Sequence, residues 1–126
     1  MDKGEPVLPG IDGGWAGPVR VTSVEGVATV GTLLVAPLLV GEEHCILEVR
    51  AKRGVSSQTH AHPHESSVYV LSGRLRTVVG RDVGELRQGE ACRHPRGAMH
   101  SVEALEDTVY LEIKTPVPDL RSVFGG

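Results

Sequence analysis

The chain of 126 residues has few aromatic side chains, few cysteines and no long apolar run. Only four aromatic residues are present, and the 13 basic and 16 acidic residues are interspersed, so the sequence lacks the stacking groups and the basic stripe that nucleic-acid binding requires. Cys45 and Cys92 lie far apart and form neither a disulfide framework nor a C-x-x-C zinc site, and we expect both thiols to be reduced and mostly buried. The longest apolar stretch, 33–40, contains Pro37 and is too short to cross a bilayer. The N-terminal segment lacks the apolar core of a signal peptide. We therefore expect a cytoplasmic protein with no nucleic-acid and no membrane partner.

Hydrophobic residues make up 40% of the chain, which is typical of a globular protein, and its length suits a single domain. Three prolines and five glycines fall within residues 1–18, which predicts an extended N-terminal arm. We expect one folded domain over residues 19–126.

Short segments rich in β-branched and alternating apolar residues follow this arm. They predict strands near 19–24, over 27–40, 46–51, 67–71, 75–79 and 108–113, with a further strand starting near Val102 and a turn at 80–84. Glycine and proline recur between these segments, and no segment keeps a helical period beyond two turns. The pattern favours an all-β sandwich or barrel.

A first cluster of polar residues runs from Gly54 to Gly73, as G-VSSQT-H-A-H-PHE-S-SVYVLS-G. His60 and His62 are two residues apart, and on a strand such residues point to the same face. Both imidazoles could then bind one metal ion. Pro63 would end regular strand pairing directly after them.

A second cluster runs from Gly89 to His100, as G-EACRH-P-R-G-AM-H. Pro95 and Gly97 predict a tight turn that presents His100. Histidine is a common ligand for zinc, copper, iron and nickel, so His100 is the candidate third ligand. His94 lies in the same cluster, where we expect a partly exposed strand position, with a pocket position as the alternative.

The order and spacing of these residues resemble the two signature motifs of the cupin superfamily, as in small single-domain bacterial members. The resemblance covers roughly residues 46–116, and it implies an all-β double-stranded β-helix, that is, a jelly-roll cupin barrel. It also implies that His60, His62 and His100 bind a divalent transition metal, such as Zn, Ni, Fe or Mn.

One expected ligand of that family is absent. The family usually has Glu, and in some members Gln or His, where this chain has Ser66, or Ser67 with the longer spacing. A neutral hydroxyl is a poor ligand compared with a carboxylate. Glu65, His64 or a water molecule are the alternatives for this fourth position.

The sequence leaves the function open between two classes. A three-histidine metal centre predicts an enzyme that acts on a small organic metabolite, either isomerase- or cyclase-like or dioxygenase-like, with Glu65 or Glu112 as the candidate proton-transfer residues. The alternative is a non-catalytic module that binds or senses a small molecule, because loss of the acidic ligand fits a site that does not have to catalyse a reaction. A storage role is a weaker third possibility.

We also expect a homodimer, as the resemblance to small cupins implies. The apolar segment 27–40 and the arm around Trp15 are the candidate surfaces for this contact.

Overall fold

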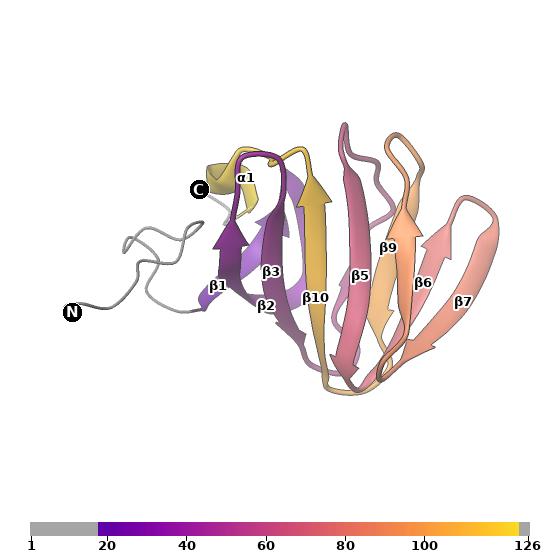
Figure 1. Cartoon of the computed structure of the whole chain (residues 1–126). Coiled ribbons are helices and arrows are strands. Elements are labelled where there is room, and N and C mark those ends of the chain that lie inside the picture. The colour runs from indigo at the N-terminus through magenta and orange to yellow at the C-terminus, as the bar shows by residue number, and fades with distance from the viewer. Residues whose placement is uncertain (1–17, 124–126) are drawn as a thin grey trace.

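The computed structural model describes residues 18–123, in which ten strands and one short helix form the fold (Figure 1). The expected arm over residues 1–18 lies, except for its last residue, outside this range. In chain order the elements are β1 (Val19–Val24), β2 (Val27–Val40), β3 (Cys45–Ala51), β4 (Ser56–Ser57), β5 (Glu65–Ser72), β6 (Arg74–Val79), β7 (Asp82–Arg87), β8 (Ala91–His94), β9 (His100–Ala104), β10 (Thr108–Thr115) and α1 (Leu120–Val123).

The strands pair in the order β7-β6-β9-β4-β2-β3-β10-β5-β8, with β1 added to β2, and the pairs are antiparallel. The first half of β2 pairs with β4 and the second half with β3, so this long strand belongs to both halves of the barrel. Segments distant in sequence are thereby brought side by side around one interior (Figure 1). The expectation of an all-β barrel is confirmed.

Alternation of side chains builds the interior. On β3 the residues Cys45, Leu47, Val49 and Ala51 are buried, while those between them are not. Burying one such valine or leucine contributes about 2 kcal/mol, so the alternating strands supply much of the stability. β5 shows the same pattern, with three buried positions at its N-terminal half and centre: Ser66, Val68 and Val70.

Two strands, β4 and β7, and the helix were not expected from the sequence. β4 is two residues long, and β7 lacks apolar alternation because five of its six residues are exposed. The predicted turn at 80–84 is therefore shorter, since β7 begins at Asp82. α1 has only four residues, too few for a helical period to show. No helix within residues 18–123 has the length and apolar character needed to cross a membrane.

Gly73, the glycine that closes the first motif, is required by its surroundings. Its φ angle is 91°, and a Cβ atom there would lie 2.5 Å from the carbonyl oxygen of Asp107 and from Oγ1 of Thr108. The turn between β5 and β6 thus packs directly against the start of β10, and a side chain at Gly73 would displace it.

Candidate metal centre

Three histidines from two distant segments meet at one end of the barrel. His60 and His62 lie in the connection between β4 and β5, and His100 begins β9. The main chains of His60 and His100 exchange two hydrogen bonds, of 3.0 and 2.8 Å, and the N–H of Gly97 donates to the carbonyl of His62 over 2.9 Å. The backbone itself therefore holds the two motifs together.

The expectation that His60 and His62 share a strand is wrong. Only His60 forms a bridge, an isolated one to His100, and His62 lies in no strand. Pro63 follows at once and cannot donate to a ladder, which explains why pairing does not extend through this segment. The imidazoles converge nevertheless, because the bridge to His100 sets the direction of the chain.

The rings of His60 and His100 turn Nδ1 toward backbone carbonyls. His60 Nδ1 contacts the carbonyl oxygen of Gln58, and His100 Nδ1 lies 3.0 Å from that of Ala98. A carbonyl oxygen can only accept, so Nδ1 carries a proton in both rings, and in the neutral form of each ring Nε2 keeps its lone pair. Both rings thus present a metal-binding nitrogen to the site.

The ligand nitrogens of the three histidines lie close to one another. His60 Nε2 and His62 Nε2 lie 2.9 Å apart, where two lone pairs repel unless a cation or a proton lies between them. Two nitrogens each about 2.1 Å from one ion lie at most about 4.2 Å apart, so this separation is compatible with coordination. His100 completes a group whose ligand atoms all lie within 4.8 Å of one another. Such an imidazole set suits a transition metal.

Burial keeps ligand histidines in the form that binds metal. It lowers the pKa of His62 to about 4 and also lowers the pKa of His100. Both imidazoles are therefore neutral near pH 7, as ligation requires.

Of the described side chains considered for the fourth position, none joins this group. Ser66 points inward and is 1% exposed, but its hydroxyl contacts His64 Nδ1 at 3.4 Å. Glu65 lies on the opposite face of β5, where its side chain is 37% exposed and faces Arg93 at 4.0 Å. His64 stacks on the ring of His62 and directs Nε2 away from the group.

Next to Ser66, a buried lysine occupies this corner of the barrel. Lys114 pairs with Ser66 across β10 and β5, and its side chain is 0% exposed. Its ammonium lies 2.8 Å from Glu25 Oε2 and 3.3 Å from Glu112 Oε2. A glutamate at position 66 would add a third carboxylate here, so the serine is consistent with its surroundings.

The two carboxylates are ionised in spite of their burial. Burial alone would raise the pKa of Glu25, but a hydrogen bond from His64 and the charge of Lys114 lower it to about 2. The same competition between burial and Lys114 gives Glu112 a lowered pKa. Burial would lower the pKa of Lys114, yet the carboxylates of Glu112 and Glu25 raise it. The three groups form one charged network.

His94 was expected to be partly exposed, and the structure corrects this. It is 2% exposed, its ring stacks on His100 with centroids 4.3 Å apart, and Nε2 lies 2.9 Å from Thr77 Oγ1. Burial lowers its pKa to about 4. Its Nδ1 is buried without a hydrogen-bond partner among the described residues, which leaves one polar atom available to a ligand.

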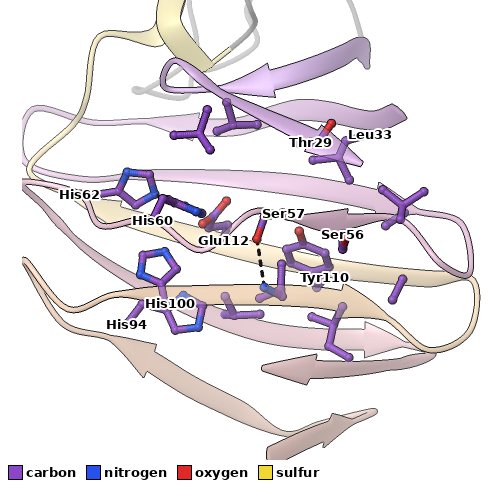
Figure 2. A pocket seen from close by; sticks show the side chains of 18 of the residues that line it. Thr29, Leu33, Ser56, Ser57, His60, His62, His94, His100, Tyr110 and Glu112 are labelled. Atoms are coloured by element: carbon purple, nitrogen blue, oxygen red, sulfur yellow. Dashed lines mark hydrogen bonds between the residues drawn. The ribbon is translucent and has the colours of Figure 1, made fainter. Parts of the chain in front are cut away.

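The histidines open onto a cavity of about 50 Å³ (Figure 2). His60, His62, His94 and His100 gather at one end, and Thr29 and Leu33 lie at the other. Glu112 and Tyr110 also line this cavity, whereas Glu65 does not. Most of the remaining lining is apolar: Val24, Val27, Ala51, Val55, Val68, Leu75, Val102 and Ala104.

Sequence reasoning did not find Glu25 or Lys114. Glu25 lies in a turn before the motifs, and Lys114 follows them near the end of the last strand. The two residues in contact are 89 positions apart, so no local pattern connects them. Gly26, directly after Glu25, indicates only that the chain turns there.

The fold and the site together define a jelly-roll barrel with a histidine cluster at one end of its cavity. The sequence pattern described as "Cupin domain" matches residues 47–114, more than half of the chain. The protein belongs to the cupin family. No curated protein matches the sequence.

Solved structures agree on the fold. A predicted oxalate decarboxylase from Thermotoga maritima is 18% identical with a TM-score of 0.71, over 87% of this chain and 100% of that one. An RmlC-like cupin from Shewanella frigidimarina is 18% identical with a TM-score of 0.68, over 79% and 96% of the two chains. KdgF from a Halomonas species is 24% identical with a TM-score of 0.67, over 69% and 81%. At these identities the likeness establishes the jelly-roll fold alone.

Proposed function

We propose that this cupin is a metal-dependent enzyme that acts on a small organic anion. The observation that carries the proposal is the convergence of His60, His62 and His100 on a cavity that also contains the ionised carboxylate of Glu112. A divalent ion such as Zn, Ni, Fe or Mn, held by the three imidazoles, would supply a Lewis acid that polarises a substrate carbonyl.

Charge around the cavity indicates the class of substrate. Glu25 and Glu112 carry two negative charges and Lys114 carries one positive charge, and an imidazole binds a metal ion in its neutral form. The network therefore has a net charge of about −1, and a divalent cation would bring it to about +1. A monoanion, such as a carboxylate or an enolate, would neutralise this charge. The small cavity with an apolar far end favours a compact, partly apolar molecule.

The residues of this chain have distinct roles in the proposal. Glu112 accepts a proton from a substrate carbon or oxygen near the ligand histidines, and Lys114 keeps its carboxylate ionised and in place. His94 offers Nδ1 as a hydrogen-bond partner for the substrate. An ionised Glu112 beside the centre favours isomerase-like proton transfer over dioxygenase-like chemistry. We assign no step to Glu65, whose carboxylate lies on the outer face.

The direct test is metal content combined with ligand substitution. We expect purified protein to contain close to one equivalent of a transition metal, and His60→Ala, His62→Ala and His100→Ala each to lose it. His44→Ala is the matched control because His44 is exposed and lies in the connection between β2 and β3. Wild-type protein without metal, and ligand variants that bind added Ni²⁺ or Zn²⁺ as well as the control does, would reject the proposal.

A second function, as a non-catalytic binding or sensing module, is favoured by one observation. The position of the family's acidic ligand is Ser66, and the nearby carboxylates are tied to Lys114. A panel of small carboxylic acids separates the two functions. Saturable thermal stabilisation without turnover of any compound supports the module, whereas turnover that is lost in Glu112→Gln supports the enzyme.

We also propose that two copies associate. Val30 and Leu38 on β2 are among the exposed large apolar side chains, and both belong to the segment expected to form the contact. Light scattering should give about twice the chain mass of 13.4 kDa, and a mass near 13.4 kDa would refute the dimer.

A further inference from the structure

Glu25 reaches the histidine cluster from an unusual backbone position. It lies between β1 and β2, where its φ is 51° and that of Gly26 is 81°. Positive φ is uncommon for a residue other than glycine, asparagine or aspartate. The backbone N–H of Glu25 donates to the carbonyl of Ser122 over 2.8 Å, so the C-terminal segment holds this conformation. Positive φ at both residues is what a two-residue hairpin turn between the paired Val24 and Val27 requires, and this turn fixes where the Glu25 side chain leaves the backbone.

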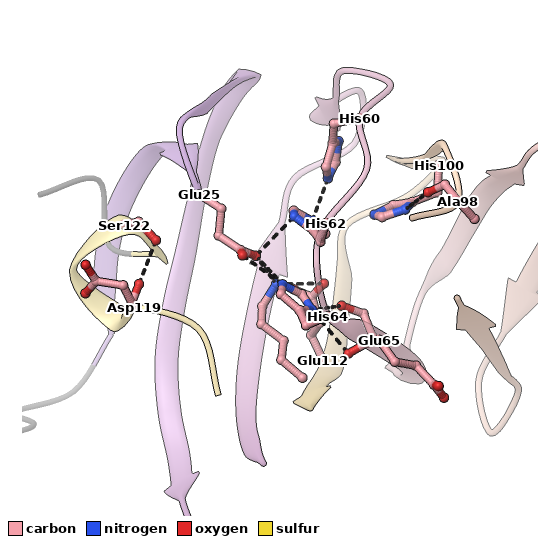
Figure 3. Close-up of polar contacts among 12 residues, drawn as sticks. Glu25, His60, His62, His64, Glu65, Ala98, His100, Glu112, Asp119 and Ser122 are labelled. Carbon is pink, nitrogen blue, oxygen red and sulfur yellow. Dashed lines mark hydrogen bonds and ion pairs between the residues drawn. The ribbon is translucent and has the colours of Figure 1, made fainter. Parts of the chain in front are cut away.

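The carboxylate of Glu25 is held by several donors (Figure 3). Its Oε1 accepts from His64 Nε2 at 2.7 Å, and its Oε2 accepts from Lys114 Nζ at 2.8 Å. The side chain is only 10% exposed. Oε2 also lies 3.5 Å from His62 Nδ1, on the side of the ring opposite to Nε2.

We propose that Glu25 is a positioning residue for His62, an inference that rests on the proposed metal centre. His60 and His100 each have a backbone carbonyl at Nδ1, whereas the acceptor that the structure provides near Nδ1 of His62 is Glu25. When a metal ion occupies the centre, the carboxylate holds the proton on Nδ1 and leaves the Nε2 lone pair for that ion. It thus sets both the tautomer and the orientation of the ring.

In this role Glu25 adds a negative charge that contacts a ligand, His62, and does not contact the metal ion itself. The family's carboxylate ligand is replaced by Ser66, which lies on the same side of the barrel as Lys114 and is its partner in the strand pair. Glu25 makes His62 a stronger donor toward a cation without binding that cation itself. The missing acidic ligand is in this way partly replaced by an acidic partner of a ligand.

A second cation site is the competing interpretation, since Glu25, His62 and His64 offer ligand atoms within 4.8 Å of one another. The ammonium of Lys114 argues against it. It is buried and already lies 2.8 Å from Glu25 Oε2, so a metal ion there would face a positive charge in a poorly solvated place. The cluster is better suited to supporting His62 than to binding an ion.

The experiment compares Glu25→Gln with Glu65→Gln, a control that removes an outward-facing carboxylate of the first motif. The glutamine has one acceptor oxygen, for which Lys114 and His64 compete, so His62 loses its acceptor. Competition with a chelator should show Zn²⁺ affinity about 10- to 100-fold lower in Glu25→Gln and within twofold of wild type in the control. Equal Zn²⁺ affinity in the two variants would overturn the proposal.

Proton and nitrogen-15 NMR of the Zn²⁺-loaded protein gives a second readout that a merely structural role would not change. The Nδ1–H of wild-type His62 should resonate downfield and exchange slowly, because the Glu25 carboxylate lies 3.5 Å from Nδ1, and Glu25→Gln should lose both features while Glu65→Gln keeps them. If the Nδ1–H of wild-type His62 shows neither feature, the inference fails whatever the variant does, even if that variant does not fold. If wild type binds no Zn²⁺, it is the proposed function that fails.

Discussion

Replacing Lys114 with methionine should destabilise the protein strongly, because this ammonium is the common partner of two largely buried carboxylates, which are 10% and 17% exposed. The side chain is fully buried, with Nζ 2.8 Å from Glu25 and 3.3 Å from Glu112. Removing one partner of a buried ion pair costs about 3–5 kcal/mol, since the remaining charge is left uncompensated. Methionine fills a similar volume, so the cost arises from charge and not from a cavity.

The magnitude can be compared with the pKa of Glu25, which is about 2 instead of 4.5. A difference of about 2.5 units corresponds to about 3 kcal/mol of stability, present above pH 4.5 and lost as the pH falls toward 2. Lys114 supplies only part of this, after the hydrogen bond from His64, but it also stabilises Glu112. We therefore expect a loss of about 3 kcal/mol for Lys114→Met near pH 7.

Thermal and urea unfolding of metal-free protein from pH 8 to pH 5 measure this effect. Without Lys114, burial raises the pKa of both carboxyls, so the variant binds a proton more readily and its deficit relative to wild type shrinks as the pH falls. Lys52→Met is the control, because Lys52 is exposed and should change stability by less than about 0.5 kcal/mol. The reasoning is refuted if Lys114→Met is as stable as the control, or if its deficit does not change with pH.

Three further predictions follow from the site and its turn. Metal-free protein should lose stability as the pH falls from 6.5 toward 4, because the pKa values of His62 and His94 are about 4 in the folded state and about 6.5 in the unfolded state. Each histidine should account for a loss of about 3 kcal/mol in the free energy of unfolding. Thermal melts at fixed ionic strength test this, and stability that stays flat across the range contradicts it. His94→Phe should keep the fold and the metal but weaken the binding of a small carboxylate about tenfold, because the hydrogen bond at Nδ1, worth about 1.4 kcal/mol, is lost. Titration calorimetry measures the affinity, and an unchanged affinity would show that His94 does not contact the ligand. Gly73→Ala should lower the free energy of unfolding by about 2–4 kcal/mol, because its Cβ would lie 2.5 Å from the carbonyl oxygen of Asp107. Gly80→Ala, which also has positive φ but open space around it, should lower it by about 1 kcal/mol. Equal losses would show that the backbone conformation alone decides the effect.

Strand positions and the motif histidines could be predicted because they depend on local patterns. Alternation in the sequence puts Leu47 and Val49 on one face of β3, and Val68 and Val70 on one face of β5, and the structure buries all four. β7 was missed because five of its six residues are exposed, so its sequence shows no apolar alternation. Its backbone pairing with β6, which no sequence pattern reveals, makes it a strand.

The composition of the site could be predicted only in part. His60, His62 and His100 were candidate ligands from spacing, and the barrel brings them together. Exposure of His94 was misjudged, because burial of a single polar residue depends on what packs over it, here the ring of His100.

The sequence by itself determined the family, the alternation of the strands and the three candidate ligand histidines, because each of these can be recognised from the spacing of nearby residues. Only the tertiary structure decided what surrounds those histidines. Glu25 and Lys114, 89 positions apart, form an ion pair because β1, β2 and β10 enclose one interior, and that closure removes water from both charges. In such a place each charge requires a partner, and no local pattern in the chain specifies which partner it finds.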